Sequence, residues 1–313
     1  ECTSGNLTGV SFAAATGVLT WDARDSQAGI YEFKIKGSTT TGLPGSDSGY
    51  QDVTVSLANV NIANYTWDQE AYIKATNSDV GDRFGISVSL DQDTIAVGAY
   101  LEDSDQTTIT NGTTAAADNS REKSGAVYVY KRSGSTWDQE AYIKADNSDA
   151  NDWFGYSVSL DQDTLAVGAR YEDSSQTTIT NGTTAPSTTG AFDSGAVYVY
   201  KRTGSTWDQE AYIKAANADA YDFFGNIVSL DQDTIAVGAW REDSDQTTIT
   251  GGTTASADDT NANAGAVYLY KRTGNTWDQE AYIKAANSDP SDWFGYSVSL
   301  DQDTLAVGAK YED

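Results

Sequence analysis

The 313-residue sequence contains no histidine, no methionine and one cysteine, Cys2. The absence of histidine excludes Ser-His-Asp and Cys-His catalysis and His-ligated zinc or iron sites. A lone cysteine excludes an intrachain disulfide and a cysteine cluster. Without a first methionine, we expect a processed or trimmed start. No apolar run approaches the roughly 20 residues that span a bilayer, so we expect no membrane insertion.

Basic residues are also scarce. Lys and Arg total 19 against 46 Asp and Glu, which gives a formal net charge of −27. Such a charge argues against binding to nucleic acid and to anionic membrane surfaces, because both are polyanions. The 19 Tyr and 8 Trp supply enough apolar surface for a folded core. No segment shows the periodicity of a helix.

The sequence is rich in internal repetition. The string TWDQEAYIKA begins at four positions that are 70 residues apart: Thr66, Thr136, Thr206 and Thr276. A Phe-Gly pair keeps the same spacing, at Phe84, Phe154, Phe224 and Phe294, and so does an Asp-Gln-Asp-Thr turn at Asp91, Asp161, Asp231 and Asp301. A repeat of this length is typical of solenoids, propellers and arrays.

Each unit predicts four short strands. In the best example they cover residues 154–160, 165–169, 196–200 and 207–214. In the first of them, large side chains alternate with small or polar ones, which is the period of a strand. The prediction is therefore an all-β fold of β-propeller blades, each with four antiparallel strands in a 70-residue repeat.

The Phe-Gly start and the later Val-Gly-Ala of each unit resemble the FG-GAP repeat, the blade of integrin α-subunit propellers and of many bacterial surface proteins. The resemblance covers residues 66–313 and implies an extracellular or cell-surface adhesion protein. Two features differ from the family. The Pro of Gly-Ala-Pro is replaced, and the calcium loop of many members is missing. Only Asp161 and Asp163 stand on the corresponding turn, and we expect them to form the turn rather than bind calcium.

The first 65 residues differ from the repeats and predict strands at 17–21, 29–36 and 53–57. Strands separated by Gly, Ser and Asp turns indicate a small β-sandwich-like segment, which resembles part of a bacterial Ig-like module and is short for a whole one. The expected domains are therefore 1–65 and 66–313. The second holds about three and a half blades, so we expect it to continue or to be completed by another chain.

The repeats differ from one another mainly in two places, just before Phe-Gly and just after Gly-Ala. In a propeller both connections emerge on the same face, so we expect a recognition surface on a constant scaffold. Trp, Tyr and Arg are typical binding hot spots. The candidate ligand-binding residues are Arg83, Tyr100, Trp153, Arg170, Tyr171, Phe223, Trp240, Arg241 and Trp293. The alternative is that loops tolerate change and that the aromatic residues cap the strand ends.

Carboxylates recur beside these positions. One hypothesis is a calcium site where two connections meet. Its candidate ligands are Asp149, Asp152, Glu172, Asp173, Asp219, Asp222, Glu242 and Asp243. The alternative is a set of solvated loop acids and Asx turns. No cofactor is certain on these grounds, and Ca²⁺ is the one that the carboxylates suggest.

Each unit also contains a polar insert between its second and third strands. Asn111-Gly and Asn181-Gly lie there between Thr-rich runs. Asn-Gly is a strong hairpin signal, so we expect a protruding β-finger that contacts the next blade or a neighbouring molecule.

The leading hypothesis is a non-enzymatic extracellular protein that binds a glycan or a protein on another cell or matrix. A second hypothesis is a structural subunit of an extracellular fibre or surface layer, associating with copies of itself. The rival class is a glycoside hydrolase with two carboxylates. It is disfavoured because the acids recur in every unit, whereas a catalytic pair should be singular.

Overall fold

The computed structural model describes residues 10–13, 18–21, 33–35, 51–53 and 68–313. The chain forms two units, Glu1–Gln69 and Glu70–Asp313. The domain boundary expected between residues 65 and 66 lies outside the described residues.

In the first unit, four strands form two antiparallel pairs. They are β1 (Val10–Ala13) with β2 (Val18–Trp21), and β3 (Phe33–Ile35) with β4 (Gln51–Val53). β2, β3 and β4 overlap the three strands expected from the sequence. The resemblance to an Ig-like module stays a prediction.

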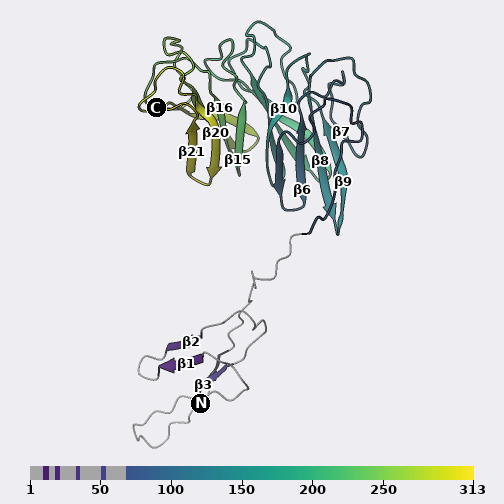
Figure 1. The fold of residues 1–313 in the computed structure, drawn as a ribbon, viewed down its shortest axis with the longest axis vertical. Helices are drawn as coiled ribbons and strands as arrows, with labels where there is room; N and C mark the ends of the chain where they lie inside the picture. The colour runs from purple at the N-terminus through teal and green to yellow at the C-terminus, as the bar shows by residue number, and fades with distance from the viewer. Residues whose placement is uncertain (1–9, 14–17, 22–32, 36–50, 54–67) are drawn as a thin grey trace, which may run out of the picture. The chain divides into compact units, whose positions relative to one another are not determined.

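The second unit is a row of antiparallel sheets, one per repeat (Figure 1). Blade 1 contains β5 (Val88–Asp91), β6 (Thr94–Ala99), β7 (Thr110–Asn111), β8 (Ala126–Ser133) and β9 (Thr136–Ile143). Blade 2 contains β10 (Phe154–Asp161), β11 (Thr164–Ala169), β12 (Thr180–Asn181), β13 (Ala196–Thr203) and β14 (Thr206–Ile213). Blade 3 contains β15 (Ile227–Asp231), β16 (Thr234–Ala239), β17 (Ile249–Gly251), β18 (Ala266–Thr273) and β19 (Thr276–Ile283). Blade 4 contains β20 (Phe294–Asp301) and β21 (Thr304–Ala309).

The strand order confirms the predicted fold class. In blade 2 the order is β10-β11-β13-β14, with each strand antiparallel to its neighbour, and β12 lies outside β14. The turn between β10 and β11 has two residues, Gln162 and Asp163, and Gln162 adopts a φ of 52°. Blades 1 and 3 repeat this order, and blade 4 is a two-stranded sheet. Blades 1 to 3 are therefore propeller blades of four antiparallel strands, as expected, each with a short fifth strand at its outer edge.

The polar insert does not form the hairpin expected from Asn-Gly. Instead, β12 adds to the outer edge of its own blade, where Thr180 and Asn181 pair with β14. The Asn181 side chain then accepts a hydrogen bond from the Trp277 amide at 2.7 Å and donates to the Trp277 carbonyl at 3.2 Å. An unpaired sheet edge is unfavourable, and the insert covers it. The expected contact with the next blade is therefore present, and the Asn181 side chain makes part of it.

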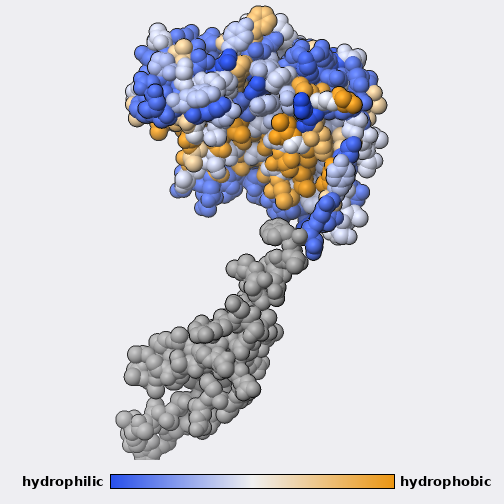
Figure 2. Space-filling view, viewed as in Figure 1, coloured by the Kyte–Doolittle hydropathy of each residue, from blue (hydrophilic) through white to orange (hydrophobic). Residues whose placement is uncertain are grey.

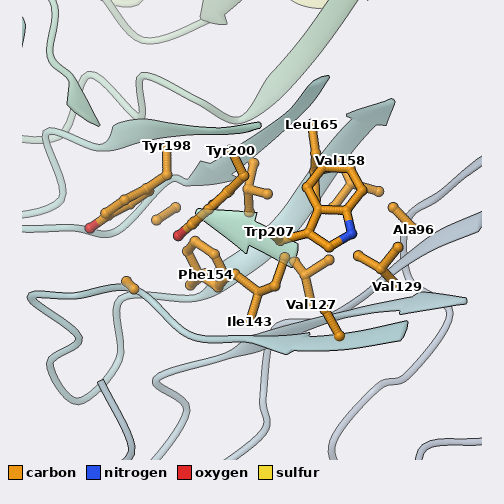
Figure 3. Close-up of a cluster of buried hydrophobic side chains, with 14 of the residues drawn as sticks. Ala96, Val127, Val129, Ile143, Phe154, Val158, Leu165, Tyr198, Tyr200 and Trp207 are labelled. Atoms are coloured by element: carbon orange, nitrogen blue, oxygen red, sulfur yellow. The ribbon is translucent and has the colours of Figure 1, made fainter. Parts of the chain in front are cut away.

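The hydrophobic core lies between successive blades. Val127, Val129 and Ile143 of blade 1 pack against a face of blade 2 that carries Phe154 and Trp207. Figure 3 shows this cluster, with the rings of Phe154, Tyr198 and Tyr200 side by side and the Trp207 indole beside Val158. The same set of side chains recurs between blades 2 and 3. Alternating apolar side chains on both faces of each sheet thus hold the blades in sequence.

Close backbone approach explains the glycines of the repeat. Gly168, the glycine before the last alanine of β11, faces Gly225 of the next blade, and a Cβ on Gly168 would overlap the Gly225 carbonyl oxygen. Gly225 itself has a φ of 82°, which side chains rarely adopt. Both glycines are therefore required by the contact between blades.

Serine side chains complete each contact. The amide of Val228 donates to Ser157 Oγ at 3.0 Å, and the amide of Leu230 donates to Ser159 Oγ at 2.9 Å. The corresponding face of β5 is open. Val88 and Leu90 are 57% and 62% exposed, whereas Val158 and Leu160 are each 6% exposed. Figure 2 shows hydrophobic residues gathered over the first sheet near β5 and β6.

Candidate functional site

The two variable connections of each blade meet. The amide of Tyr171, just after β11, donates to the carbonyl of Asp152, just before β10, at 3.3 Å. Equivalent bonds link Leu101 to Asp82, Arg241 to Asp222, and Tyr311 to Asp292, at 3.2, 3.4 and 3.0 Å. Main-chain hydrogen bonds therefore place both sets of variable positions at one end of the sheets, as expected from the repeat.

Aromatic side chains at these positions form a continuous row across the blades, which we name the variable row. Its rings belong to Tyr100, Trp153, Tyr171, Phe223, Trp240, Trp293 and Tyr311. Successive ring centroids lie between 4.0 Å, for Trp240 and Trp293, and 5.4 Å, for Phe223 and Trp240. Every successive pair is in direct ring contact, so the row is one packed unit.

Cations lie over the rings of the variable row. The Arg170 guanidinium is 4.9 Å from the Trp153 ring and 4.5 Å from the Tyr171 ring. Arg241 is 4.7 Å from Phe223, and Lys310 is 5.0 Å from Trp293. Such contacts hold a positive charge against an aromatic face. Of the nine predicted ligand-binding residues, six thus belong to the row's rings, and Arg170 and Arg241 belong to its cations. The ninth, Arg83, makes no ring contact among residues 68–313.

The backbone holds the central rings in an unusual conformation. Trp153, Phe223 and Trp293 have φ values of 58°, 58° and 59°, and Arg83 has 62°. A left-handed conformation of a bulky residue costs on the order of 1–3 kcal/mol and persists only where its surroundings enforce it. Here the preceding blade does so, because the Trp153 amide donates to the Lys123 carbonyl at 3.2 Å and the Phe223 amide donates to the Asp193 carbonyl at 3.2 Å.

Glu172 and Glu242, two of the carboxylates proposed for calcium, bind lysines. Glu172 Oε2 lies 3.0 Å from Lys214 Nζ, and Glu242 Oε2 lies 2.7 Å from Lys284 Nζ, with both partners buried. The other oxygen of Glu172 accepts a hydrogen bond from Asn147 Nδ2 at 3.0 Å. Burial lowers the pKa of Lys214. These ion pairs recur in blades 1 to 3 and were not recognised in the sequence, although a lysine closes each apolar strand TWDQEAYIK.

The aspartates of the set mostly bind main-chain amides. Asp152 and Asp222 are buried and accept from the amides of Asp149 and Asp219, at 2.7 and 2.9 Å. Burial raises the pKa of Asp152, and it raises the pKa of Asp222 to about 8. Two further acids bind loop amides: Asp173 accepts from Asp193 at 2.7 Å and Asp243 accepts from Asn263 at 2.5 Å. Asp149 lies 3.3 Å from Arg121.

These eight carboxylates do not converge. In the part of the chain that the structure describes, no group of three or more acidic, Cys or His side chains could hold a metal ion. The calcium hypothesis therefore stays a prediction without a coordinating group. The turn between the first two strands likewise does not fit the calcium loop of related repeats. Asp163 Oδ1 lies 2.7 Å from Arg202, and Asp161 Oδ2 accepts from the Gln232 amide at 2.8 Å.

A cavity of about 390 Å³ opens beside the variable row between blades 3 and 4. Arg241, Trp293 and Tyr311 supply a cation and two aromatic rings to it, and Asn263, Asp292 and Asp313 add polar groups. A second feature of this face is an exposed aromatic pair, Phe192 and Tyr221, joined by a main-chain hydrogen bond of 2.8 Å. In the sequence, the only sign of this pair is that its two positions differ from one repeat to the next.

Comparison with family models decides the affiliation of the repeats. The FG-GAP repeat matches residues 67–130, 137–200, 207–270 and 277–313, which is more than half of the chain. The chain belongs to the FG-GAP repeat family. FG-GAP repeats commonly mediate adhesion or recognition, are typically non-enzymatic and are typical of extracellular or surface proteins. A comparison with curated proteins finds no match. Among the described residues, no helix could cross a membrane.

Proposed function

We propose that this FG-GAP protein is a non-catalytic recognition protein of the cell surface or extracellular space. It binds a glycan or a protein through the variable row. The observation that carries the proposal is the row itself, in which positions that differ between otherwise near-identical repeats are brought together as contacting rings and cations. Clustered Trp, Tyr and Arg side chains are the usual centres of binding energy.

The acids that recur in every repeat make structural contacts, whereas the variable positions form the row. Glu172 and Glu242 neutralise buried lysines, and Asp152 and Asp222 accept main-chain hydrogen bonds. Structural contacts therefore account for these recurring acids, and the non-enzymatic proposal needs no catalytic pair from them.

Replacing one ring of the row tests the proposal. We expect Trp153→Ala to weaken binding to a glycan or matrix-protein panel about tenfold or more, because a half-buried hot-spot tryptophan is removed. The matched control is Trp137→Ala, since Trp137 is also half-buried but lies in β9 and contacts Arg132. Equal binding by both variants and the wild type, with both folded by circular dichroism, would sink the proposal.

A second candidate is a structural subunit that associates with copies of itself. The exposed apolar face of β5 favours it, because the same positions are buried between blades 1 and 2 and between blades 2 and 3. A copy that docks there would make a heterologous, head-to-tail contact, which produces rings or filaments. Light scattering tests this candidate, and a single-chain mass at every concentration would contradict it.

A further inference from the structure

The cations of the variable row lack acidic partners. Arg132, Arg202 and Arg272, away from the row, each pair with two carboxylates. By contrast, no salt bridge of residues 68–313 includes Arg170, Arg241 or Lys310. In a protein with a net charge of −27, carboxylates for such pairs are plentiful. A set of cations without acidic partners on one face therefore calls for an explanation outside the chain.

Unsatisfied N–H groups gather at the same place. Arg170 Nε, Trp240 Nε1 and Arg241 Nε are buried and make no hydrogen bond. All three side chains contact the ring of Phe223, at 5.4, 5.4 and 4.7 Å. A buried donor without an acceptor is costly, and each one in a native protein requires a reason. Three such donors lie around one ring, and one of them belongs to Arg241, which also lines the cavity between blades 3 and 4.

The surrounding groups leave this place positive. Two terminal nitrogens of Arg170 donate within the protein, to Asn226 Oδ1 at 3.1 Å and to Tyr171 Oη at 2.7 Å. Asp193 interacts electrostatically with both arginines, and burial raises the pKa of its carboxyl. One carboxyl thus interacts with two guanidiniums. Asp292 and Asp313 lie further along, in the cavity that Arg241 lines.

The rings next to these cations suit a sugar ligand. Arg241 shares its cavity of about 390 Å³ with Trp293 and Tyr311, and Trp153 and Tyr171 flank Arg170 on the other side. Flat aromatic faces with a few polar groups between them suit the apolar face of a pyranose ring, and guanidiniums suit carboxylate or sulfate.

We infer that the ligand of the variable row is an acidic glycan, whose carboxylate or sulfate groups bind at Arg170 and Arg241, which both contact the ring of Phe223. The inference rests on the proposed function and adds the chemical class of the ligand. Because the protein is strongly negative overall, the local cations select acidic groups only at short range, within about one Debye length of 8 Å at physiological salt.

Matched pairs of polysaccharides test the inference at 150 mM salt. The probes are polygalacturonate against its methyl ester, and dextran sulfate against dextran, titrated into the full chain by calorimetry. We expect the acidic member of one pair to bind at least tenfold more tightly than its neutral partner, and the pair that does so identifies carboxylate or sulfate. Arg241→Gln and Arg170→Gln should each remove most of this preference, whereas Arg241→Lys should keep part of it. Arg132→Gln, at a paired arginine in β8, is the control and should bind as the wild type does.

The remaining outcomes overturn the inference. Equal binding of the neutral and acidic members, still sensitive to Trp153→Ala, would refute the acidic class and leave the proposed function standing. Binding to neither pair refutes the acidic glycan. Tighter binding of polyglutamate, unaffected by Trp153→Ala, would show that an acidic polypeptide is the ligand instead.

Discussion

At the residue scale, buried charge distinguishes positions that look alike in the sequence. Glu172 and Asp173 are neighbours and recur together, yet Glu172 is buried against Lys214 while Asp173 accepts a hydrogen bond from a loop amide. The repeat could predict that these acids have fixed roles. It could not predict which acid meets the lysine, because the partners are 42 positions apart and the folded sheet brings them together.

Asp222 should make stability depend on pH. Its folded pKa of about 8 exceeds the ordinary value of 3.8 because the carboxyl is buried. Between these values the folded state holds a proton that the unfolded state releases, so the stabilising contribution of Asp222 is complete below pH 4 and is lost as the pH rises to 8. Relative to Asp222→Asn, whose Oδ1 can still accept from the Asp219 amide, the wild type should lose about 1 kcal/mol per pH unit in this window.

Urea titrations of both proteins at pH 5, 6, 7 and 8 measure that difference. Asp118 is a suitable control site, since it is exposed and hydrogen bonds lower its pKa. The Asp118→Asn difference should be constant over the same pH range. A pH-independent Asp222→Asn difference would mean that the carboxyl is ionised in the fold.

At the element scale, the four main strands of each blade could be predicted from the sequence, but the short strand at the outer edge of the sheet could not. The expected strands at 154–160, 165–169, 196–200 and 207–214 match β10, β11, β13 and β14 to within a few residues, because alternation reports which side chains face a neighbouring blade. β12 was missed. It is two residues long, and its pairing depends on the edge of β14 and on Trp277 of the next blade.

Two equivalent leucines should differ sharply in their contribution to stability. Leu160 of β10 is 6% exposed between blades 1 and 2, whereas Leu90 of β5 is 62% exposed. We expect Leu160→Ala to lower the free energy of unfolding by about 2–4 kcal/mol and Leu90→Ala by less than about 1 kcal/mol. Because the two strands share their sequence pattern, propensity cancels in this comparison. Similar losses, measured by urea unfolding of the monomer, would show that the face of β5 is covered.

At the scale of the whole molecule, the charge of −27 is the dominant electrostatic feature. The buried Lys–Glu pairs neutralise charge inside the blades. The excess acids therefore lie on the surface, where they repel one another. The candidate site differs from the rest of the surface in its local charge. Its cations attract anionic groups at short range, whereas the molecule as a whole repels them. The sequence composition predicted the field, and the positions of the cations required the folded blades.

Salt should therefore stabilise the protein. Screening shortens the range of repulsion from about 30 Å at 0.01 M ionic strength to about 3 Å at 1 M. We expect the midpoint of thermal unfolding to rise by several degrees over this range of NaCl, measured by calorimetry. CaCl₂ at equal ionic strength separates screening from binding. Equal midpoints in the two salts would mean that screening alone acts, whereas a further rise that saturates at low millimolar calcium would support the sites predicted at Asp149, Asp152 and their repeats. A midpoint that falls with NaCl would show that attraction between surface charges, rather than their repulsion, governs the stability of the fold.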